Sequence, residues 1–197
     1  MRCRWIKIGG QICEILEIDK GGLARHFNLV NNESYSPSAK VLIAGVGHPN
    51  LKDLSFGQIF LAHLKEQNWP DNVDLENLSF GAIAVLQWFQ DEPGKYDRVI
   101  FVSAAEREGR EPGTLNVYNW NFAPLDEEVV QECVAESVTG IISLDNLMMI
   151  LQYFKALPAE VVVLDLEPVS SEIGFECSPE ITERFPEFEE IVRGRYR

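Results

Sequence analysis

Three side chains with nitrogen or oxygen donors, His48, Asp53 and Glu76, lie at or after the first two strands that the sequence predicts. In open α/β sheets, ligands bind at the carboxyl ends of the strands. If the three side chains converge at that edge, they form a site for a ligand or a metal ion. Each also has a simpler interpretation: His48 as a turn residue that bonds local backbone, Asp53 as a helix cap and Glu76 as a lone surface acid.

Two further acids, Asp165 and Glu167, end a later apolar strand. They either line the same edge of the sheet or lie in solvent. The sequence supports no Ser-His-Asp or Cys-His arrangement, because Ser103 and Cys133 have no identifiable base nearby in the sequence.

The four cysteines are scattered, without CxxC spacing, and none has metal-ligand spacing to one of the three histidines. We therefore expect reduced cysteines and no structural zinc site.

The stretch Val41–Gly57 predicts the element that would position His48 and Asp53. Residues 41–44 are continuously apolar, as a parallel strand covered on both faces requires. Gly45 and the glycine two residues later allow a tight turn. A helix is expected to follow through residues 58–64, with Asp53 or Ser55 as its cap.

Strands and helices alternate along the rest of the chain, which predicts an α/β three-layer sandwich. Its mainly parallel, five-stranded sheet would carry helices on both faces. The expected strands are 73–78, 98–104, 161–166 and an antiparallel 114–120, and the expected helices are 82–90, 144–154 and 179–196, the last interrupted near Pro186.

Residues 1–40 differ from this pattern. They predict short strands at 5–8 and 12–18, a third strand at 23–30, and a polar linker over 31–40. The chain would then consist of a small N-terminal β extension with its linker and an α/β domain over residues 41–197.

The net charge of −14 over 197 residues argues against a nucleic-acid binder and is compatible with a basic protein partner. No apolar run approaches the roughly 20 residues that a membrane helix needs. The N-terminus shows no apolar signal-peptide core, so we expect a cytoplasmic protein that does not bind membranes.

Residues 41–192 resemble the hydrogenase maturation proteases. The opening motif of that family is Gly-x-Gly-Asn, four residues, a pair of acids and Gly-x-Gly. The matching residues are Gly45, Gly47, Asp53 and Gly57, with the later turn Glu111-Pro112-Gly113-Thr114 and the helix start Ser178-Pro179-Glu180.

The chain departs from the family where metal is contacted. His48 replaces the Asn of the motif, and Leu54 replaces its second acid. Glu76 stands at or near the second metal-contacting position, and Gly140 at or near the third, a His in the family. No His follows His63, so Glu76 is the one retained metal-ligand candidate.

The resemblance implies an endopeptidase that removes a C-terminal peptide from the large subunit of a nickel–iron hydrogenase, with the nickel carried by that substrate. The missing ligands favour a degenerate relative that binds a hydrogenase-like large subunit as an assembly factor and has no cofactor of its own. The expected binding-cleft residues are Gly47, His48, Asp53, Leu54 and Glu76.

Two other functions stay open: an active endopeptidase with a rewired site, and a small-molecule α/β enzyme that uses the same crevice. The N-terminal arm also has a weak similarity to the small β-barrel chaperones of hydrogenase assembly. In those chaperones a cysteine directly follows Met, whereas Arg2 precedes Cys3 here. The alternative for this arm is a purely structural extension.

Overall fold

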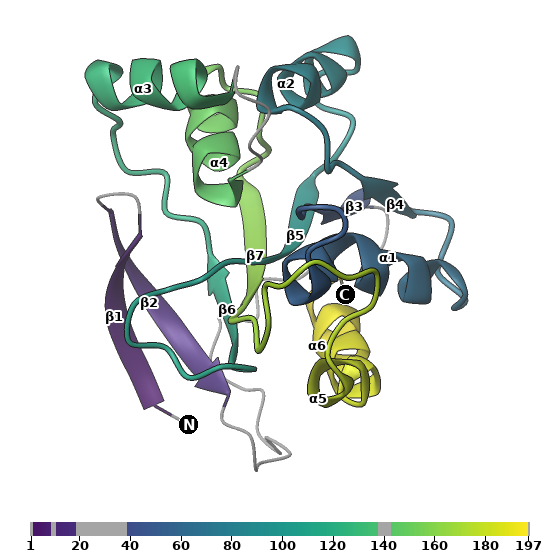
Figure 1. Cartoon of the computed structure of the whole chain (residues 1–197). Helices are drawn as coiled ribbons and strands as arrows, with labels where there is room; N and C mark the ends of the chain where they lie inside the picture. The colour runs from purple at the N-terminus through teal and green to yellow at the C-terminus, as the bar shows by residue number, and fades with distance from the viewer. Residues whose placement is uncertain (1, 9–10, 19–38, 138–142, 197) are drawn as a thin grey trace.

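The computed structural model describes residues 2–8, 11–18, 39–137 and 143–196, built around a mixed β-sheet (Figure 1). Within these residues, seven strands pair in the order β1-β2-β6-β7-β5-β3-β4. The strands are β1 (Arg2–Ile8), β2 (Gln11–Ile18), β3 (Val41–Gly45), β4 (Val73–Asn77), β5 (Arg98–Ala104), β6 (Leu115–Asn119) and β7 (Glu160–Leu166).

Four consecutive strands, β4, β3, β5 and β7, run parallel, with β4 at the edge of the sheet, and β6 pairs antiparallel with β7. Every residue of β3 and β5 is buried, because helices cover both faces of the sheet. This confirms the predicted five-stranded, mainly parallel sheet.

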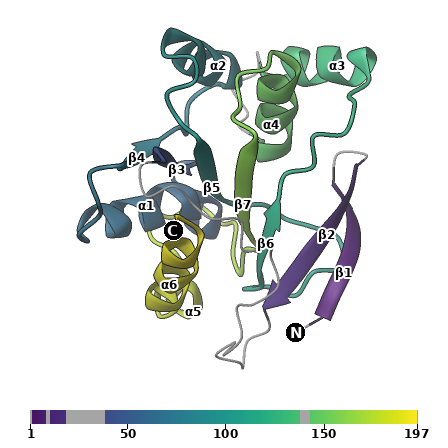
Figure 2. The same cartoon turned by 180° about the vertical axis from the view of Figure 1, so that it is seen from behind.

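The first two strands extend this sheet at its β6 edge. β1 and β2 form an antiparallel pair, and β2 pairs antiparallel with β6. Figure 2 shows the pair at the opposite edge from β4. The predicted strand 23–30 and most of the predicted linker lie outside the described residues, and the domain division at residue 40 stays a prediction.

Helices form a layer on each face of the sheet (Figure 1). α2, α3 and α4 contact one another on one face, and α1 contacts α6 on the other. The helices are the 3-10 helix η1 (Lys52–Ser55), α1 (Phe56–Lys65), α2 (Ala82–Asp91), α3 (Glu127–Ser137), α4 (Leu144–Tyr153), α5 (Pro179–Thr182) and α6 (Phe185–Tyr196).

Two cores hold the layers together. One packs α2 and α4 against β3 through Val85, Leu147 and Leu42, and the other packs α1 and α6 through the rings of Phe60 and Phe188. Stacked and edge-to-face ring pairs of this kind add stabilisation beyond the burial of their area.

Two helices differ from the prediction in detail. The C-terminal helix is interrupted, as predicted, but before Pro186: α5 ends at Thr182 and α6 begins at Phe185, because proline is tolerated in the first turn of a helix. The sequence pattern predicts no element at α3, because its buried face is narrow and has only two apolar residues, Val130 and Cys133, beside Ser137.

Candidate functional site

The glycines of the opening motif let α1 approach the end of β3. A Cβ atom on Gly45 would lie 2.3 Å from the carbonyl oxygen of Gly57, and one on Gly57 would lie 2.2 Å from that of Val46. Real Cβ atoms do not come this close to backbone oxygens, so both positions require glycine. The helix can therefore begin directly at the strand end.

The turn between β3 and α1 is closed by its own hydrogen bonds. The backbone N–H of His48 donates to Leu54 at 2.9 Å, and the Ser55 hydroxyl donates to the His48 carbonyl at 2.6 Å. The buried N–H of Gly47 donates to the Ser79 hydroxyl at 3.1 Å. His48 thus lies in a bonded turn, while its side chain faces a pocket.

Asp53 does not cap α1, and this prediction was wrong. The N-cap position is Ser55, which makes no side-chain cap hydrogen bond. The Asp53 carboxylate is completely buried and accepts hydrogen bonds from the backbone of Val169, Ser170 and Ser178 and from the Ser178 hydroxyl, at 2.6–2.9 Å. A buried carboxylate needs such donors, and the loop after β7 supplies them.

His48 and Leu54 line a pocket of about 220 Å³ at the carboxyl ends of β3 and β5. Its other lining residues are Ala104, Ala105, Glu106, Arg107, Ser143, Leu144 and Asp145. Burial lowers the pKa of His48 below its ordinary value of 6.5. The imidazole is therefore neutral at pH 7 and able to accept a proton or a hydrogen bond.

Glu76 lies outside this pocket. It is an exposed residue of β4, paired with Ala44 of β3, and its charge acts on Lys95 and Tyr96. The pocket lining contains neither Glu76 nor Asp53. Gly140 lies outside the described residues, and a binding role for these positions stays a prediction.

Arg107 lies at the centre of this edge and is not among the residues that the sequence pattern predicts there. Its Nη1 and Nη2 atoms donate to the two carboxylate oxygens of Asp145, and its Nε donates to Asp165 at 3.1 Å. Burial would lower the pKa of Arg107, but the bond to Asp145 and the charges of both acids raise it above its ordinary value. A paired, bidentate guanidinium of this kind holds a fixed orientation.

Asp165 and Glu167 line this edge and are buried there, not solvated. Arg110 donates to Asp165 at 3.2 Å, and the backbone N–H of Arg107 donates to Glu167 at 3.0 Å. Burial raises the pKa of both carboxyl groups, and the two arginines act in the opposite direction. The sequence signal for this network has two parts. One is the pair of arginines shortly after the buried strand β5, and the other is the pair of acids at the end of β7.

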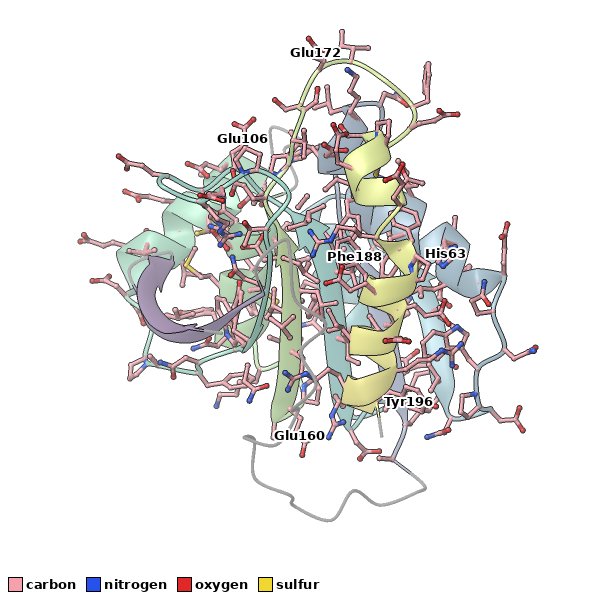
Figure 3. All side chains as sticks on the ribbon, turned by 90° about the horizontal axis from the view of Figure 1, so that it is seen from below. His63, Glu106, Glu160, Glu172, Phe188 and Tyr196 are labelled. Atoms are coloured by element: carbon pink, nitrogen blue, oxygen red, sulfur yellow. The ribbon has the colours of Figure 1, made fainter. Side chains whose placement is uncertain are left out.

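A second hollow of about 350 Å³ adjoins the pocket and shares Glu106 and Arg107 with it. Its other lining residues are Glu108, Glu167, Pro168, Val169, Ser170 and Ser171. Figure 3 shows Glu106 and Glu172 at one end of the sheet and Glu160 and Tyr196 at the other. Both hollows thus lie at the carboxyl end of the parallel strands.

The described thiols lie in the cores. Cys133 is 4% exposed, and Cys177 is 7% exposed. Burial raises the pKa of Cys133, and burial together with the charge of Asp53 raises that of Cys177 to about 12. Neither group is the accessible thiolate that a cysteine nucleophile requires. Within the described residues, no three His, Cys, Asp or Glu side chains are placed to hold a metal ion.

Solved structures share this architecture, although no protein-family model and no curated protein sequence matches the chain. The hydrogenase 2 maturation peptidase of a Thaumarchaeota archaeon is 24% identical, with a TM-score of 0.54, over 78% of this chain and 95% of that one. The hydrogenase maturating endopeptidase HybD of E. coli is 21% identical, with a TM-score of 0.57, over 79% and 91%. The [NiFe] hydrogenase maturation protease HycI of Thermococcus kodakarensis is 22% identical, with a TM-score of 0.55, over 80% and 92%.

The chain has the hydrogenase maturation protease fold. The similarity covers most of each of these three proteins, so the shared feature is the whole α/β sandwich. None of the helices in the described parts of the chain is long and apolar enough to cross a membrane.

Proposed function

We propose that this chain is a hydrogenase maturation protease-like protein of the cytoplasm that binds a folded hydrogenase-like large subunit without cutting it. In this role it is an assembly factor: the scaffold recognises the subunit, and any nickel belongs to that subunit. The fold and the opening motif support the choice of partner. The chemistry of the strand-end pocket supports the absence of cleavage.

The observation that carries the proposal is the combination of Leu54 and Arg107 in one pocket. Leucine has no lone pair to offer a metal ion. The Arg107 guanidinium already binds the carboxylates of Asp145 and Asp165, so the pocket has few free oxygen donors to offer a metal ion. Transition ions need several N, O or S donors in defined geometry, which this arrangement does not supply.

One observation favours an active peptidase with a rewired site as a second candidate. The neutral His48 imidazole shares the pocket with Ser143 and Asp145. An imidazole in this state is suited to general base catalysis. In this candidate, nickel again belongs to the substrate.

The deciding experiment mixes the purified chain with its host's hydrogenase-like large subunit that still carries the C-terminal extension. We expect a stable complex in which mass spectrometry finds the extension intact. A maturation protease that acts on the same subunit is the positive control for cleavage. Removal of the extension by the wild type, but not by His48→Ala, would establish the peptidase, and absence of a complex would exclude the assembly role.

A further inference from the structure

The loop after β7, residues 169–178, is held tightly against the turn that precedes α1. Four hydrogen bonds tie it to the Asp53 carboxylate. Gly174 forms a β-bridge with Leu51, its N–H donates to Asn50 at 2.9 Å, and its carbonyl accepts from Lys52 at 3.2 Å. A Cβ on Gly174 would lie 2.7 Å from the Lys52 side chain, so glycine allows this close contact.

This anchored loop exposes two large apolar side chains. Ile173 is 84% exposed and Phe175 is 79% exposed, while the next most exposed large hydrophobic side chain in the described part of the chain is Phe154 at 45%. Neighbouring apolar groups that a soluble protein leaves in water mark surfaces that other molecules cover. Because the backbone is fixed on both sides, binding need not order the loop, and only the two side chains lose conformational freedom.

The charges around the loop indicate what covers it. Glu172 and Glu176 flank the apolar pair and are exposed, and Glu106 and Glu108 line the adjoining hollow together with the start of the loop. Lys52, the neighbouring cation, is already paired with Glu172. A complementary surface therefore has an apolar depression with a basic border.

We propose that the 169–178 loop is the docking element of this chain, with Ile173 and Phe175 inserting into an apolar depression bordered by Lys or Arg on the hydrogenase-like large subunit. This inference rests on the proposed function and names its contact surface. The loop borders the same edge as the pocket of His48 and Arg107, through the hollow that Val169 and Ser170 line. A subunit bound there would also cover the strand-end pocket.

The test titrates the purified large subunit against the full-length chain and against the double variant Ile173→Ser/Phe175→Ser. Both side chains lie mostly in solvent, so the variant should keep the melting temperature of the wild type. We expect its affinity to fall by about tenfold or more, as removal of central apolar anchors does at interfaces. The matched control is Phe122→Ser/Phe154→Ser, which removes two partly exposed aromatic rings elsewhere and should bind as the wild type does.

The outcomes separate the two proposals. If the wild type binds the subunit and the double variant binds it equally well, the loop is not the docking element, while the assembly role survives. If the wild type binds no large subunit, both proposals are wrong. If both double variants weaken binding equally, the effect is not specific to the loop and the inference is also overturned. Self-association of the wild type that the loop variant abolishes would instead make a second copy the occupant.

Discussion

At the scale of single residues, Asp53 shows how a motif position can keep its side chain and have a structural function. Its neighbour in the motif is Leu54, a pocket residue without donors. The Asp53 carboxylate is fully occupied by donors from the 169–178 loop. The three glycines of the motif have backbone atoms close to where a Cβ would lie. The packing of the fold therefore explains all four motif residues that match the family, without a role in catalysis.

We predict that Asp53→Asn lowers the free energy of unfolding by about 2–4 kcal/mol. An amide has one acceptor oxygen, so its NH₂ group would face the N–H donors of Val169, Ser170 or Ser178. Urea denaturation monitored by fluorescence measures the change. Ser178→Ala, which removes one hydroxyl donor and keeps the carboxylate, should cost about 1 kcal/mol. Equal stability of Asp53→Asn and the wild type would mean that the loop is held by other contacts.

His48 gives a pH dependence with a defined sign. Burial places its pKa in the folded state below the ordinary value of 6.5, so near that pH the unfolded chain binds more protons than the folded one. The contribution of His48 to the free energy of unfolding is fully present above pH 6.5, and it is lost as pH falls through the lowered pKa of the folded state. NMR titration of the imidazole measures the pKa directly. The difference in stability between wild type and His48→Gln should rise with pH in this window, and a pKa above 6.5 would contradict the placement.

Some residues of the candidate site could be predicted from the sequence, and others could not. The nearness of His48 and Leu54 at one strand end follows from a local stretch, because the strand, turn and helix are contiguous, whereas the rest of their pocket comes from residues 104–107 and 143–145. Arg107, Asp145 and Asp165 come from a loop, a helix and a strand that are far apart in the sequence, and only the fold brings them together. The acids that end β7 are visible in the sequence, but their burial beneath two arginines is not.

At the scale of elements, the packing of α1 on β3 determines where the pocket lies. Adding a methyl group at Gly57 would place it 2.2 Å and 2.5 Å from the carbonyl oxygens of Val46 and Val102. The Val102 oxygen belongs to the backbone of β5, and Val46 directly follows β3 and donates its N–H to that same oxygen, so neither carbonyl can easily move aside. The helix would have to shift away from the sheet, with loss of contacts between α1 and its core.

We predict that Gly57→Ala lowers stability by about 2–3 kcal/mol, the cost of overpacking a tight contact. The matched control is Gly194→Ala in α6, where a Cβ has no neighbour within 4 Å. That change should raise stability by about 0.5–1 kcal/mol, because alanine favours a helix more than glycine does. Thermal unfolding should show a lower melting temperature for Gly57→Ala and a higher one for Gly194→Ala. An unchanged melting temperature for Gly57→Ala would mean that α1 can move without cost.

Elements with strong patterns could be predicted from sequence, and weaker ones could not. β5 and β7 are continuous apolar runs that predict buried strands, and the alternation of strands and helices predicts the sandwich. α3 has few buried residues, so its sequence carries little helical periodicity. The pairing of β2 with β6 joins segments about a hundred residues apart, and no local pattern encodes it.

At the scale of the whole molecule, the acidic charge and the exposed apolar pair act on different parts of binding. The net charge of −14 acts over a distance and accelerates encounter with a basic surface. Ile173 and Phe175 act after contact, by removing apolar area from water. The first effect is screened by salt and the second is not, so the two can be separated by ionic strength.

We predict that the association rate with the large subunit falls steeply as salt rises from about 0.1 M to about 1 M, because the Debye length shortens from about 10 Å to about 3 Å. The dissociation rate should change little over the same range, since the apolar contact holds the complex. Stopped-flow measurement of both rates separates the effects. Glu172→Gln/Glu176→Gln should flatten the salt dependence of association, whereas Ile173→Ser/Phe175→Ser should mainly accelerate dissociation. If the association rate is independent of salt, the acidic surface does not steer the partner, and the basic border assigned to the partner is wrong.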